Sequence, residues 1–183
     1  MILSGNRILK EIEAGNIQID PFDIKRMNPN SYNVRLAEDL LTYDHSILDM
    51  KREEPYTIER IPDSGKLLIP GKIYLARTIE HSFTRGFVPM LEGRSSVGRL
   101  GLFVHATAGF GDNGFDGYWT LELSCVQPII IYSGVEIAQL YYCELSDING
   151  EGELGIPVEY SAGKYQKNTG VQPSMLWKDF KTI

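Results

Sequence analysis

The stretch TAGFGDNGFDGYWTLEL, residues 107–123, joins a glycine-crowded segment to a run with the periodicity of a β-strand. Side chains along a strand point alternately to opposite faces. Continued to residue 125, one face of this run is Trp119, Leu121, Leu123 and Cys125, and the other is Tyr118, Thr120, Glu122 and Ser124. The alternation predicts a strand that packs one face on a core and carries Glu122 on the other face.

Seven further runs with strand character surround this one, at short intervals and separated by turns rich in glycine and proline. They span residues 32–36, 56–61, 66–80, 87–93, 101–108, 128–134 and 135–145. Many short strands with such turns are typical of a sandwich, a jelly roll or a barrel. The sequence therefore predicts a mainly β fold.

The length and composition fit one globular domain over residues 1–183. A chain of this size with 43% hydrophobic residues can bury its own core. Near the start, Ser4 can cap a short helix that Gly15 ends. From Ser161 onward the sequence is polar and glycine-punctuated, which predicts a flexible C-terminal tail over residues 161–183.

The acidic composition restricts the class of partner. The formal charge is -6 at pH 7 and the sequence pI is near 5.1, whereas nucleic acids and anionic membranes require a positive surface. No apolar run approaches the roughly 20 residues of a membrane span, and the first ten residues lack the apolar core of a signal peptide. We expect a cytoplasmic protein that binds neither nucleic acid nor membrane. The cysteines and histidines lack metal-ligand spacing, so no zinc site is expected.

Three groups of residues could carry chemistry. The turn EGRSSVGRLGL, residues 92–102, holds two arginines beside two serines, which suits phosphate oxygens but equally fits an ordinary polar turn. Glu122 could shuttle protons if its face lines a cleft, or could simply face solvent. Asp112 lies between Gly111 and Asn113, where aspartate is also common for turn geometry alone.

Taken together and in order, these motifs resemble the dCTP deaminase branch of the trimeric dUTPase superfamily. The resemblance covers most of the chain, through MILS at the start, NPNSYNVRL, GRSS, the TAG to TLEL block and GKYQKNTG in the tail. It implies a distorted β jelly roll of the dUTPase-like β-clip type that forms a homotrimer. It also implies active sites between subunits, each closed by the C-terminal tail.

The resemblance further implies hydrolytic deamination of dCTP without zinc. Glu122 would be the catalytic proton shuttle, Arg99 would support it, and the backbone of Thr107 and Ala108 would hold the attacking water and face the base. Mg²⁺ would enter through the nucleotide phosphates. The residues implied to contact the substrate phosphates are Arg94, Ser95, Ser96, Tyr160, Lys164 and Asn168.

Asp112 matches an aspartate that activates water at the α-phosphate in dUTPase relatives and that contacts the sugar elsewhere in the superfamily. Because Gly109 and Phe110 follow the Thr-Ala pair, the resemblance favours an enzyme that forms dUMP, with dUTP as a second substrate. A deaminase that releases dUTP remains an alternative, as does a non-catalytic nucleotide-binding regulator on the same fold. dTTP is a candidate feedback inhibitor.

Overall fold

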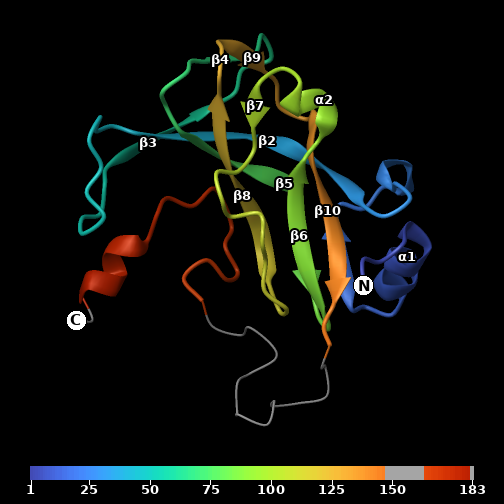
Figure 1. The fold of residues 1–183 in the computed structure, drawn as a ribbon. Coiled ribbons are helices and arrows are strands. Elements are labelled where there is room, and N and C mark those ends of the chain that lie inside the picture. Colours follow the sequence, from blue (N-terminus) through green and yellow to red (C-terminus); the bar gives the residue numbers. More distant parts are fainter. Residues whose placement is uncertain (147–162, 182–183) are drawn as a thin grey trace.

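The computed structural model describes residues 1–146 and 163–181 and has a mainly β architecture (Figure 1), as the sequence predicts. The helical elements are α1 (Gly5–Glu13), α2 (Ser95–Gly98), and the 3-10 helices η1 (Ile24–Arg26) and η2 (Leu176–Lys181). The strands are β1 (Ile17–Asp20), β2 (Tyr32–Tyr43), β3 (Tyr56–Arg60), β4 (Lys66–Leu68), β5 (Tyr74–Thr84), β6 (Phe87–Gly93), β7 (Leu102–Phe103), β8 (Asp116–Cys125), β9 (Ile129–Ile131) and β10 (Glu136–Glu144). Within the described residues, no helix is long and apolar enough to cross a membrane.

The strands form one large antiparallel sheet and a small one. The large sheet has the order β6-β10-β2-β5-β8-β7, with β1 paired to β5 and β3 paired to β2. The small sheet pairs β4 with β9. Residues 109–111 join the β6 edge to the chain entering β8, because Leu91 N donates to Gly109 O at 2.7 Å and Gly111 N to Pro89 O at 2.9 Å. This seam nearly closes the large sheet into a barrel.

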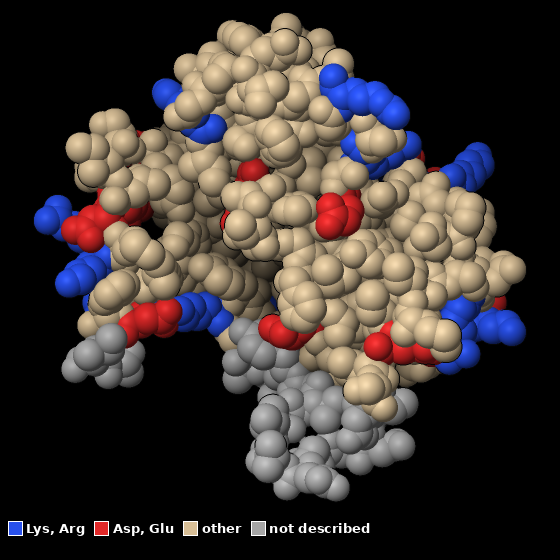
Figure 2. Space-filling view, in the orientation of Figure 1, with Lys and Arg blue, Asp and Glu red and all other residues tan. Residues whose placement is uncertain are grey.

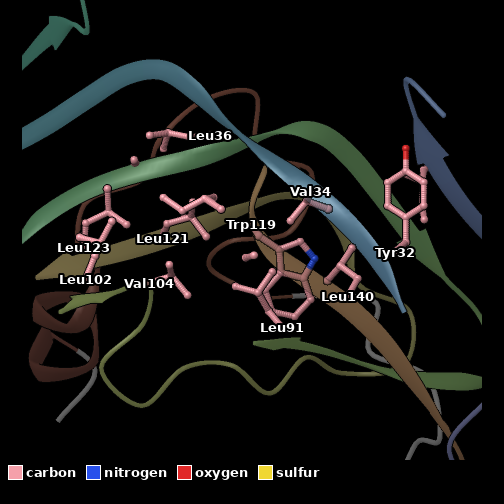
Figure 3. Packing of buried hydrophobic residues seen from close by; sticks show 14 of the residues in the cluster. Tyr32, Val34, Leu36, Leu91, Leu102, Val104, Trp119, Leu121, Leu123 and Leu140 are labelled. Carbon is pink, nitrogen blue, oxygen red and sulfur yellow. The ribbon is translucent and has the colours of Figure 1, made fainter. Parts of the chain in front are cut away.

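The core confirms the alternation predicted for β8. Along this strand every second residue is buried, and Trp119, Leu121 and Leu123 point inward. Figure 3 shows Trp119 among side chains from β6, β10 and β2, including Leu91 and Leu140. The indole Nε1 donates to Ser82 Oγ at 3.0 Å, so the buried polar atom of this tryptophan is satisfied. The opposite face of β8 is left available for a site.

Replacing Leu121 with alanine should lower the free energy of unfolding by about 2–5 kcal/mol, because it removes a fully buried side chain and leaves a cavity. Urea denaturation would measure the change. Ile47→Ala is the control, because Ile47 is 85% exposed and its loss should change stability by less than about 0.5 kcal/mol. Equal losses in the two variants would contradict the assigned core.

The short N-terminal helix forms as predicted. Ser4 Oγ accepts a hydrogen bond from Arg7 N at 3.3 Å, and the helix is followed by Gly15 with φ of 77°. A left-handed residue after the last turn is the ordinary end of a helix, and glycine adopts it without steric penalty.

Three predicted strand runs differ in detail from the structure. The run 66–80 divides into β4 and β5, because a Pro-Gly turn with Gly71 at φ 79° interrupts it. The run 101–108 keeps only the two residues of β7. The run 32–36 continues to Tyr43 in β2, and Asn33 within it is 6% exposed because its amide bonds to neighbouring polar side chains.

Candidate active site

Glu122 lies on the face of β8 that points away from the core, and it is half-buried. Its Oε2 accepts a hydrogen bond from Ala106 N at 2.7 Å, and its own N–H donates to Val104 O at 2.9 Å. Within the described part of the chain, Oε1 forms no hydrogen bond. The backbone of the segment after β7 therefore orients the carboxylate and leaves one oxygen for a substrate.

Asp112 is exposed on a turn whose neighbours are tied to the rest of the sheet. Asn113 Oδ1 accepts from Gly86 N at 2.6 Å, and Gly114 N donates to Thr84 O at 2.8 Å. One bond reaches the turn between β5 and β6 and the other reaches the last residue of β5. The aspartate is thus presented by a fixed loop, and Asn113 supplies part of the anchoring.

The glycines in this segment are required by close backbone approach. A Cβ on Gly109 would lie 2.5 Å from Leu91 O, and a Cβ on Gly111 would lie 2.7 Å from the Trp119 ring. Both contacts are far shorter than real Cβ contacts. The glycine-crowded stretch therefore closes the seam between β6 and β8, and it places Phe110 and Asp112 on the open side.

Glu122 and Asp112 line the same cavity, which has a volume of about 470 Å³. Its walls come from β8, from the seam and the residues on either side of it (108–112), from β5, and from the tail. The lining residues are Tyr43, Leu48, Ile73, Leu75, Ala108, Phe110, Gly111, Asp112, Phe115, Tyr118, Trp119, Thr120, Glu122, Tyr165, Gln166, Asn168, Gln172, Pro173 and Ser174. Two carboxylates within mainly aromatic and apolar walls suit a flat polar ring attached to a hydroxylated group.

No lysine or arginine is present among the described residues that line the cavity. The face shown in Figure 2 is hollowed near its centre, and its lysine and arginine side chains lie mostly toward the margin. The described residues of a single chain therefore offer the cavity two acids and no cation. A polyphosphate bound there would need positive charge from elsewhere.

The described part of the tail, residues 163–181, packs beside β8. Asn168 Oδ1 accepts from Tyr118 N at 2.8 Å, and its Nδ2 donates to Tyr118 O at 2.9 Å. One residue earlier, Lys167 N donates to Asp116 O at 2.7 Å. The tail thus binds the backbone of β8 at residues 116–118, a part of the strand that β7 does not pair with.

An apolar anchor holds the next part of the tail. Val171 is buried against Leu41, Leu75 and Tyr43. The hydroxyl of Tyr43 accepts a hydrogen bond from Ser174 N at 2.8 Å. Burial raises the pKa of the Tyr43 phenol, which stays neutral at physiological pH. These contacts fix the tail as one wall of the cavity.

The structure does not bring the predicted phosphate-binding turn to this cavity within one chain. Arg94 precedes the short helix α2, which carries Ser95 and Ser96, and none of the three lines the cavity. Arg99, predicted to support Glu122, is exposed, and its Nη1 lies 3.5 Å from Ser95 Oγ. That predicted contact with Glu122 is absent within the described chain and stays a prediction for an assembly.

Of the remaining predicted site residues, some line the cavity and others do not. Ala108 lines the cavity, whereas Thr107 beside it does not. Lys164 forms an ion pair with Asp179 in η2. Tyr160 lies outside the described residues. One chain therefore brings together the two predicted carboxylates, Glu122 and Asp112, but not the predicted phosphate-binding residues of the GRSS turn.

Comparison with known proteins identifies the family of this chain. The model of the dCTP deaminase-like family matches residues 2–145. This chain belongs to that family. The match covers the whole barrel, including the seam and both carboxylates, so the resemblance and the fold agree.

Two full-length relatives of this dCTP deaminase-like chain are named dCTP deaminase, dUMP-forming. The protein of Clostridium beijerinckii is 59% identical over 181 residues, covering 99% of both chains. The protein of Leptospira biflexa is 55% identical over 181 residues, again covering 99% of both. The two alignments include the tail as well as the barrel.

A solved structure supports the fold of this dCTP deaminase-like chain. The 2'-deoxycytidine 5'-triphosphate deaminase of Agrobacterium tumefaciens superposes with a TM-score of 0.61 at 19% identity. The likeness covers 77% of this chain and 47% of that protein, so this chain spans about half its length. The shared architecture agrees with the expected jelly roll of the superfamily.

Sequence reasoning missed several groups that shape the site of this dCTP deaminase-like chain. Ala106 orients Glu122 through its backbone, which no residue type reveals. Tyr43 and Val171 anchor the tail from positions far apart in the sequence. Tyr118 offers its backbone to Asn168, and only its place on the predicted polar face of the strand could have indicated that it lies near the site.

Proposed function

We propose that this chain converts dCTP and water to dUMP, with release of ammonia and pyrophosphate. The observation that carries the proposal is that Glu122 and Asp112 line one cavity. Both named relatives are dUMP-forming dCTP deaminases over nearly the full chain. The alternatives of a deaminase that stops at dUTP and of a non-catalytic regulator are less favoured by these relatives.

Deamination needs a base and an acid at the same carbon. Glu122 would accept a proton from a water that attacks C4 of cytosine, then donate a proton to N3 and assist the transfer to the departing N4. Ala106 N holds Oε2 of this carboxylate, which lines the cavity, and Oε1 forms no hydrogen bond within the described residues. One carboxyl group that alternates between its two forms serves every transfer, and the bond lost is C4–N4.

Release of pyrophosphate needs a second water. Asp112, at the fixed turn beside the cavity, would activate that water for attack on the α-phosphorus. The P–O bond to the β-phosphate breaks and pyrophosphate leaves. Mg²⁺ would enter through the triphosphate, whose negative charge it would partly neutralise.

A triphosphate requires cations, which are lacking among the described residues that line the cavity. Away from the cavity of the same chain lies α2, which carries Ser95 and Ser96 and is flanked by Arg94 and Arg99. We infer that α2 of a neighbouring copy completes each site in a cytoplasmic homotrimer, and that Lys164 and Asn168 close the tail over the substrate. A deoxynucleoside triphosphate such as dTTP, which shares sugar and phosphates with the substrate, would compete for this site.

A direct assay tests the reaction. The purified protein is incubated with dCTP and Mg²⁺, nucleotides are separated by anion exchange, and ammonia is assayed in parallel. We expect dUMP and ammonia in equal amounts with little dUTP. Accumulation of dUTP would assign the chain to the deaminase alternative. Tight dCTP binding without ammonia release would favour the regulator.

Mixing two inactive variants should restore activity if sites lie between copies. Glu122→Gln chains keep Arg94, and Arg94→Ala chains keep Glu122. In randomly mixed assemblies of equal amounts, about a quarter of the sites would combine both intact halves. Ammonia release should recover to about that fraction of wild type. Each variant mixed with itself is the control, and no recovery in verified mixed assemblies would contradict a shared site.

A further inference from the structure

We infer that Glu136 is a positioning residue that holds the Arg94 guanidinium ready for the substrate triphosphate. Arg94 Nη1 lies 3.0 Å from Glu136 Oε2 and donates to the Glu136 backbone oxygen at 3.1 Å. Both side chains are about one-third exposed, so the contact is partly screened from solvent. The inference rests on the proposed role of Arg94 in phosphate binding.

Two nitrogen atoms of the Arg94 guanidinium, Nε and Nη2, remain available to bind phosphate. Both contacts to Glu136 use Nη1, and within the described residues Nε and Nη2 form no hydrogen bond. Two parallel N–H groups are the arrangement that binds phosphate oxygens in a bidentate manner. Glu136 therefore fixes one corner of the guanidinium and leaves a fork for the ligand.

Glu136 is itself held in place from β2. Asn33 Nδ2 donates to Glu136 Oε2 at 2.9 Å, and Asn28 Nδ2 donates to Asn33 Oδ1 at 2.9 Å. The β10–β2 register shifts between Glu136 and Ala138, which is the kind of irregularity that re-aims a side chain. The NPNSYN segment thus supports the arginine of the GRSS turn through this carboxylate.

The charges around Glu136 indicate that this carboxylate orients Arg94 and does not itself attract the anionic substrate. Arg26 Nε lies 3.7 Å from Glu136 Oε1, and Arg26 also pairs with Asp23. A carboxylate beside a phosphate site repels the ligand. Glu136 therefore strengthens binding only if the free energy gained from ordering the Arg94 side chain in advance exceeds this repulsion. Holding the guanidinium in advance removes part of the ordering entropy of binding.

The test is a double-mutant cycle on dCTP affinity in the presence of Mg²⁺, measured by calorimetry. Glu136→Ala should weaken dCTP binding about tenfold, the equivalent of one charge-assisted hydrogen bond. In an Arg94→Ala background the same change should have almost no further effect. In the steady state, KM should rise about tenfold while kcat stays within about twofold of wild type.

Two further variants separate positioning from general stability. Glu136→Gln keeps an oxygen that can accept from Arg94 and Asn33, so its affinity should stay within about threefold of wild type. Glu144→Ala removes a carboxylate from the far end of the same strand, where it pairs with the N-terminus at 3.6 Å, and should leave KM unchanged.

An equal loss from Glu136→Ala with and without Arg94 would overturn the inference, as would unchanged affinity in a folded Glu136→Ala protein. If wild type binds dCTP but releases no ammonia, the proposed function fails while the affinity cycle still decides the role of Glu136. If wild type binds no dCTP, both proposals fail.

Discussion

Glu122→Gln is expected to lower the rate of ammonia release from dCTP by about 10²–10⁴, the usual effect of losing a general acid–base group. The carboxamide keeps the size of the side chain and an oxygen for the Ala106 N–H bond, so the site should retain its shape. It cannot accept the proton of the attacking water. Affinity for dCTP should therefore change by less than about threefold.

Stopped assays of ammonia across dCTP concentrations, with dCTP binding measured on the same variant, would check this result. Ser124→Ala is the matched control, because Ser124 lies two residues further on the same face of β8 and outside the cavity. It should keep wild-type turnover. Undiminished ammonia release by a folded Glu122→Gln protein would remove Glu122 as the base.

Asp112→Asn is expected to change the product from dUMP to dUTP. The amide cannot activate the second water, so formation of dUMP should fall by about 10²–10⁴. Ammonia release should continue, because Glu122 and its backbone donor are untouched. Asparagine preserves the size of the side chain, and the turn remains anchored through Asn113 and Gly114.

The control for this prediction is Asp116→Asn in the same hairpin. Asp116 directs its carboxylate to His81 Nε2 at 3.2 Å, and it does not line the cavity. This variant should still form dUMP. Continued dUMP formation by Asp112→Asn, at a rate near that of wild type, would mean that Asp112 only positions the sugar.

The periodicity of single strands was sufficient to predict much of the fold. The alternation around Trp119 and Leu121 identifies the buried face of β8, because burial on one side of a sheet imposes a period of two. The cap at Ser4 identifies the start of α1 for an equally local reason. The assignment of Glu122 to the open face followed from the same pattern.

Contacts between distant segments could not be predicted in this way. Asn33 is buried because Glu136, about a hundred residues later, accepts its hydrogen bond. The tail wall depends on Asn168 reaching the backbone of Tyr118. Both interactions are set by the three-dimensional path of the chain rather than by local sequence. The separation of Arg94 from the cavity within one chain is a feature of the same kind.

Reaction of dCTP in water enriched in ¹⁸O tests the central claim most directly, with products analysed by mass spectrometry. If water attacks C4 and then the α-phosphorus, dUMP should contain two heavy oxygens, one at C4 and one on phosphorus, and pyrophosphate should contain none. A product dUTP with one heavy oxygen would contradict the role assigned to Asp112. Heavy oxygen in pyrophosphate, with none on the phosphorus of dUMP, would contradict attack at the α-phosphorus.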